Sequence, residues 1–223
     1  KSVKLGNDIN SYLGQTKEDS LENLVEYVGA DGKFVSITKS VTIYYPEGYL
    51  KGVEIVDTPG FNDPIVSREE RTKAFLNKAD VVILMLYAGR PFDATDRDIL
   101  FKNVRQCGIG KVLIGINKYD IPFANGEFED EIKNYVIDEI KKACRSCEDD
   151  TLNDILKETT PISLSAEMAL LSKLPMSTIN ANDIYQTAWK RHCDNFEIST
   201  QQDFARLSLL DNLTSAIKEL VEK

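Results

Sequence analysis

The stretch KVLIGINKYD, residues 111 to 120, decides how the rest of the sequence is interpreted. Its run of Val, Leu and Ile shows no polar alternation, which predicts a strand buried on both faces of a parallel sheet. The run ends in Asn117, Lys118, Tyr119 and Asp120, so polar side chains follow the carboxyl end of the strand. Ligands of open α/β sheets bind at that end.

A second stretch, GVEIVDTPGFND at residues 52 to 63, has the same construction. Its apolar residues predict a buried strand that ends at Asp57, and Pro59-Gly60 predicts a turn. A carboxylate oxygen suits a hard cation, so we expect Asp57 to hold Mg²⁺ through a water. The amide of Gly60 is expected to donate to the terminal phosphate of a nucleotide, which also makes Gly60 a candidate catalytic group.

Strands and helices alternate along most of the chain, which predicts an α/β fold with a mostly parallel sheet covered on both faces. One strand is expected to be antiparallel, because the segment 35–45 turns at Pro46-Glu47-Gly48 and returns as 51–57. The predicted strands are 35–45, 51–57, 80–89, 111–120, which ends in Asn-Lys-x-Asp, and 161–166. The predicted helices are 67–79, 95–108, 129–146, a short one after it, and one at the C-terminal end.

The composition bounds the function. The 223 residues carry a net charge of −9, which argues against a basic nucleic-acid surface. No apolar run approaches the roughly 18 residues that cross a bilayer, and four cysteines without a secretory signal fit a reducing compartment, so we expect a cytoplasmic protein. The first residue is Lys, and we therefore expect a fragment of a longer chain. We expect residues 1–223 to form one domain.

The residues at the end of the segment 111–120 predict a site that recognises guanine. The Asp120 carboxylate can accept hydrogen bonds from both N1–H and the exocyclic amine of guanine, a pair of donors that adenine does not present. Asn117 is expected to tie the loop together and reach the base edge, while the stem of Lys118 covers the ring. At the end of the segment 161–166, a backbone amide of Ser165 or Ala166 is expected to meet the guanine carbonyl oxygen.

Together, DTPG, NKYD and the late Ser-Ala resemble the third, fourth and fifth motifs of translation-factor-like GTPases. The run from VEIVDTPG to TDRDIL, residues 53–100, is similar to bacterial dynamin-like GTPases, including the type linked to enterotoxin output. The resemblance covers residues 35–166. It implies a P-loop NTPase-like three-layer sandwich, GTP or GDP and Mg²⁺ as cofactors, and hydrolysis of GTP. It also implies pairing of two GTPase domains, as a homodimer or with a related dynamin-like chain.

Membrane remodelling is a further implication of the resemblance, through peripheral contact made by regions outside this chain. The family also needs a phosphate loop, G-x-x-x-x-G-K-[ST], and the sequence has none. We therefore expect a GTPase domain that lacks its N-terminal phosphate-loop segment. The resemblance implies a switch threonine that closes over Mg²⁺ during catalysis. Thr38 is the candidate and Thr16 a weaker one, although a threonine in a strand also fits a solvent-facing position.

Two alternative interpretations of the function stay open. Phe61 follows DTPG, where some GTPases place a glutamine that orients water, so a non-hydrolysing nucleotide-binding module is one alternative. A septin-like or other membrane-associated GTPase is the second. The pair Cys144-x-x-Cys147 fits thiols at a helix end better than a zinc site. The single histidine, His192, follows Lys190 and Arg191 and is predicted to lie on the surface.

Overall fold

The computed structural model describes residues 8–58, 72, 74–104, 111–146, 153–154, 156 and 159–221. They divide into two compact units, Lys1–Glu54 and Ile55–Lys223. The expectation of a single GTPase domain stays a prediction.

The N-terminal unit is built from short helical pieces and an aromatic cluster. The ring of Phe34 stacks on Tyr27 with centroids 5.1 Å apart, and Tyr12 meets it edge-on. The Lys17 ammonium lies 5.4 Å from the centre of the Phe34 ring and bonds the Asp19 carboxylate. The elements are α1 (Ile9–Tyr12), η2 (Leu21–Asn23), α2 (Leu24–Val28) and η3 (Gly48–Leu50).

The strands predicted at 35–45 and 51–57 are wrong, since residues 35–47 and 51–58 form turns and extended chain without a ladder. The antiparallel strand expected from this pair is therefore absent from the described residues. Ile43, Tyr44 and Tyr45 are 51%, 92% and 60% exposed. A strand pair without a neighbouring sheet to cover its apolar face is marginal in water, and no described strand adjoins this one.

The second unit contains the predicted parallel sheet, which confirms the α/β fold. Its strands β1 (Val81–Tyr87), β2 (Lys111–Asn117) and β3 (Ile162–Leu164) are all parallel and lie in the order β1-β2-β3. Gly115 of β2 pairs with Met85 on one side and Ile162 on the other. Ile114 and Ile116 are completely buried, as the continuous apolar run predicts for the middle strand.

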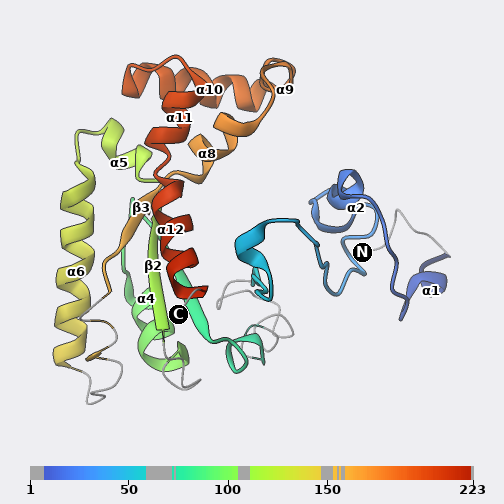
Figure 1. The fold of residues 1–223 in the computed structure, drawn as a ribbon, viewed down its shortest axis with the longest axis horizontal. Helices are drawn as coiled ribbons and strands as arrows, with labels where there is room; N and C mark the ends of the chain where they lie inside the picture. Colours follow the sequence, from blue (N-terminus) through green and yellow to red (C-terminus); the bar gives the residue numbers. More distant parts are fainter. Residues whose placement is uncertain are drawn as a thin grey trace. The chain divides into compact units, whose positions relative to one another are not determined.

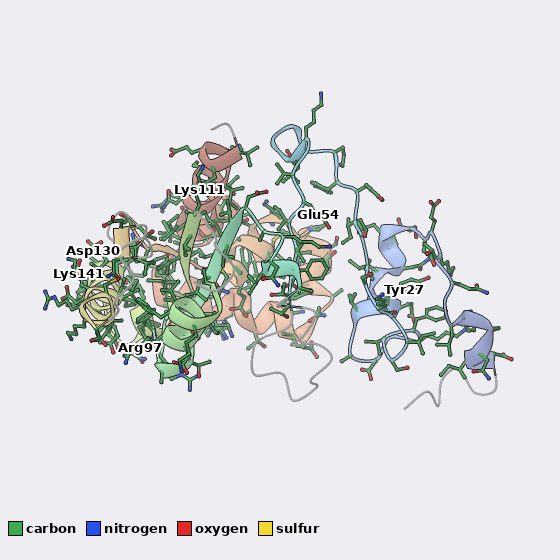
Figure 2. The ribbon with its side chains drawn as sticks, turned by 90° about the horizontal axis from the view of Figure 1, so that it is seen from below. Tyr27, Glu54, Arg97, Lys111, Asp130 and Lys141 are labelled. Atoms are coloured by element: carbon green, nitrogen blue, oxygen red, sulfur yellow. The ribbon has the colours of Figure 1, made fainter. Side chains whose placement is uncertain are left out.

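Helices cover the sheet and supply most of the core. Figure 1 shows α6 (Glu129–Arg145) beside the strands, with α12 (Leu210–Val221) passing over them. Val136 and Ile140 on one face of α6 are buried against the sheet core, while Figure 2 shows Asp130 and Lys141 on the side of α6 away from the strands. Other helices around the sheet are α4 (Ala94–Asp98), its π-helical continuation η4 (Ile99–Val104) and α5 (Asp120–Ala124).

Between β3 and α12 the chain forms a group of helices with an apolar core of its own, and we call residues 166–207 the helical insert. In Figure 1 it lies beyond the carboxyl ends of the strands, next to α5. Its core packs Met168, Leu171, Ile179, Ala188 and Phe204. The insert comprises α8 (Ala166–Lys173), α9 (Met176–Asn180), α10 (Asp183–Phe196) and α11 (Gln201–Leu207).

Candidate functional site

Two loops at the carboxyl ends of β2 and β3 are joined by one side chain. The Oδ1 atom of Asn117 accepts the amide of Lys118 at 2.8 Å and the amide of Ala166 at 3.0 Å. Lys118 takes a positive φ of 63°, which turns the chain sharply after the strand. These two bonds hold the segments 117–120 and 165–166 next to each other.

The second loop is held from two sides. Ser165 is completely buried, its Oγ accepts the amide of Met168 and caps α8, and its own amide donates to Ser208 at 2.8 Å. The amides of Ser165 and Ala166 are therefore both used within the protein. These residues fix the loop, and donation from either amide to a guanine carbonyl stays a prediction.

Asp120 begins α5 and is 4% exposed. Its Oδ1 atom is buried and has no hydrogen-bond partner among the described residues. A buried carboxylate oxygen without a donor is costly, so a ligand that supplies one gains that free energy on binding. The N1–H and amine of guanine are donors of this kind, and recognition of guanine by Asp120 stays a prediction.

Neighbouring aromatic residues fix this segment. The Tyr119 hydroxyl donates to the Leu207 carbonyl, and the Tyr119 amide donates to the Leu164 carbonyl at 3.4 Å. Burial, with the nearby Glu129 and Asp120 carboxylates, raises the pKa of Tyr119 well above its ordinary value, so the hydroxyl stays protonated as a donor. The Lys118 ammonium lies 5.8 Å from the centre of the Tyr87 ring, where its stem was expected to cover a base.

The structure gives less information on the residues predicted to bind Mg²⁺ and the phosphates. Asp57 is exposed and lies in extended chain, so the prediction that it ends a buried strand is wrong; Ile55 and Val56 before it are 58% and 40% exposed. Thr38 belongs to the N-terminal unit, and its hydroxyl donates to the Phe34 carbonyl at 2.9 Å. Among the described residues, no group of metal-ligating side chains includes either position. Gly60 lies outside the described residues.

Sequence reasoning missed two polar residues beside Asp120. The prediction that His192 lies on the surface is wrong, because the residue is completely buried. Its Nε2 atom is 2.7 Å from Oε2 of Glu167, the residue that follows Ser165-Ala166. A signal existed in the helical spacing of Ala188, His192 and Phe196, which places all three on one face of α10.

One oxygen each of Asp120 and Glu167 and one nitrogen of His192 lie within 4.8 Å of one another, a grouping of atoms that metals can use. An Arg191 nitrogen, however, bonds Oε2 of Glu167 and lies 3.4 Å from Nε2 of His192. The Arg191 guanidinium therefore already lies beside the Glu167 and His192 atoms that a metal ion would use.

Of the cysteines, Cys144 is buried in the sheet core and Cys147 lies outside the described residues.

No helix in the described part of the chain is both long enough and apolar enough to cross a membrane. The two joined loops at the strand ends, with the buried carboxylate of Asp120 beside them, are the candidate site that the structure offers.

Known proteins are similar to parts of this chain. A 158-residue stretch is 30% identical to a probable transmembrane GTPase, FZO-like and chloroplastic, of Arabidopsis thaliana, and covers 71% of this chain and 15% of that protein. A 103-residue stretch is 30% identical to dynamin-like protein 1 of Campylobacter jejuni, covering 46% of this chain and 14% of the relative. An uncharacterised protein of Caldicellulosiruptor is 27% identical over 93% of this chain and 48% of its own length.

The chain thus spans less than half of each of these three relatives. The model of the dynamin family matches residues 5–119, which include the DTPG segment, β1, β2 and most of the NKYD loop. Together with the parallel sheet and the two joined loops, this match shows that the chain belongs to the dynamin family, as part of a GTPase domain.

Proposed function

We propose that this chain binds guanine nucleotides and forms part of an enzyme that hydrolyses GTP to GDP and phosphate. The observation that carries the proposal is the buried Oδ1 atom of Asp120, which has no donor among the described residues and lies beside the two loops that Asn117 joins. Guanine supplies two donors on one edge, so its base would offer this carboxylate the hydrogen bonds that the described residues do not supply.

The phosphate side of the proposal rests on chemistry and on family membership. Asp57 offers a carboxylate of the kind that binds Mg²⁺ through water, Gly60 an amide for the terminal phosphate, and Thr38 a hydroxyl that would have to leave Phe34 to reach a metal. Magnesium would stabilise charge on the transferring phosphoryl group. The residues of this chain would hold the base and orient the nucleotide.

Base recognition is tested by titrating the full-length protein with GDP and with ADP in a calorimeter. We expect GDP to bind more tightly than ADP, and we expect Asp120→Ala to weaken GDP binding by about tenfold or more. Asp130→Ala, a change at an exposed acid of α6, is the matched control. Equal affinity of the wild type for the two nucleotides would refute guanine recognition.

Hydrolysis is tested separately by phosphate release from GTP. The variant Asp57→Ala should lose activity, whereas Glu54→Ala, an exposed acid three residues earlier, should retain it. Phe61 after DTPG and the missing phosphate-loop motif favour a second candidate, a module that binds nucleotide without hydrolysing it. That candidate predicts tight GDP binding together with equally low phosphate release from the wild type and Asp57→Ala.

Pairing of two GTPase domains and remodelling of a membrane belong to the proposal for the whole protein. The Arabidopsis relative is named a transmembrane GTPase, and this chain covers 15% of it. Co-sedimentation of the full-length protein with vesicles, and its mass in solution with and without GTP, would test the two properties.

A further inference from the structure

The helical insert packs on the segment that carries Asp120. Phe196 of α10 stacks on Phe123 of α5 with ring centroids 4.4 Å apart and planes 5° from parallel. The same ring meets Tyr119 at 6.1 Å, and the Tyr119 hydroxyl bonds the Leu207 carbonyl at the end of α11. The position of Asp120 is therefore coupled to α10 and α11, which follow it by some 60 to 90 residues in the chain.

At the centre of this contact lies His192. Its ring is buried, with Phe196 and Phe204 centroids at 6.2 Å and 5.9 Å. Its Nε2 atom is 2.7 Å from Oε2 of Glu167, and because an ionised carboxylate only accepts, Nε2 carries the shared hydrogen. Glu167 therefore fixes the orientation of the imidazole.

The orientation matters because of what lies beside the ring. Oxygens of Asp120 and Glu167 and a nitrogen of His192 lie within 4.8 Å of one another, so a buried carboxylate and a solvent-exposed one approach each other beside the imidazole. Two carboxylate charges this close repel each other, and the dipole of a neighbouring imidazole can offset part of that repulsion. Nδ1 of His192 and Oδ1 of Asp120 both lack partners among the described residues.

We propose that His192, oriented by Glu167, is a positioning residue that keeps the Asp120 carboxylate aimed at both donors of guanine. This role rests on the proposed function, and it makes the helical insert a determinant of base selectivity. The imidazole, held by Glu167, supplies a dipole of fixed orientation beside the Asp120 carboxylate. The Arg191 guanidinium holds Glu167 from the solvent side, since its nitrogen bonds the same Oε2 atom.

The test compares GDP with inosine diphosphate, which lacks the exocyclic amine, by titrating both into the full-length protein. If His192 aims Asp120, His192→Leu loses the hydrogen bond to that amine, and the GDP-to-IDP affinity ratio falls about tenfold. His192→Gln, which can still donate to Glu167, should keep the ratio within about threefold of the wild type. Lys190→Gln, at an exposed neighbour on α10, is the control and should leave the ratio unchanged.

A second variant, Glu167→Ala, tests the same inference if His192→Leu does not fold. The Glu167 side chain is 42% exposed, so Glu167→Ala should fold, and it should lower the ratio in the same direction because the ring loses its anchor. A loss of GDP and IDP affinity in equal proportion would show that His192 only supports packing, and would overturn the inference.

Two further outcomes would also overturn it, and they differ from each other. If the wild type binds GDP no better than ADP, guanine recognition itself fails and the inference falls with it. If a zinc-selective chelator abolishes the GDP-to-IDP ratio of the wild type and added Zn²⁺ restores it, the three side chains hold a metal, and His192 acts as a ligand. A ratio that is unaffected by the chelator and lowered by both His192→Leu and Glu167→Ala supports the positioning role.

Discussion

Replacing Asn117 by Ala should separate the two loops of the candidate site. Its Oδ1 atom accepts two backbone amides, from Lys118 at 2.8 Å and from Ala166 at 3.0 Å. Both donors are near the surface, so water can replace part of what is lost, and each bond contributes about 0.5–1.5 kcal/mol net. The sum is about 1–3 kcal/mol.

These bonds are present before any ligand arrives, so their loss lowers the free energy of unfolding and leaves the loops free to separate. Binding must then restore the geometry of the loops, so the same free energy is lost from the free energy of binding. We expect GDP affinity of the full-length Asn117→Ala variant to fall by about 5- to 150-fold, the same free energy expressed as a ratio.

Isothermal titration with GDP measures this change directly, and urea unfolding measures the stability term in the same samples. Asn212→Ala, an exposed asparagine on α12, is the control and should match the wild type in both assays. GDP affinity within twofold of the wild type for Asn117→Ala would refute the argument that the joined loops form the nucleotide site.

Three further predictions address stability. Ile114→Ala removes a completely buried side chain from the middle strand and should lower the free energy of unfolding in urea by about 2–5 kcal/mol. Tyr119→Phe loses the bond to the Leu207 carbonyl and should cost about 0.5–1.5 kcal/mol in the same assay. The hydrogen bond from Lys17 lowers the pKa of Asp19, so its stabilisation of the N-terminal unit is present above about pH 4 and is lost as the pH falls below it. Hydrogen exchange should show that Asp19→Asn removes this acid sensitivity, and an unchanged acid response would contradict the assignment.

Local sequence alone determined the elements whose apolar residues form a continuous run or repeat with a helical period. The runs at 81–87 and 111–117 are strands in the structure, and the periodic segment 129–145 is a helix with Val136 and Ile140 on its buried face. The polar residues after β2 and β3 could also be placed at one edge of the sheet, because parallel strands end on the same side. These features depend on neighbours in the chain or on one simple rule of topology.

Tertiary structure decided the features that depend on distant partners. The segments 35–45 and 51–57 have strand composition, yet a strand forms only where another pairs with it and covers its apolar face. The burial of His192 was likewise hidden by its charged neighbours in sequence, since its environment comes from Glu167, Phe204 and Asp120 on three other elements. Periodicity reports which face of a helix is covered, and only the assembled fold determines which groups cover it.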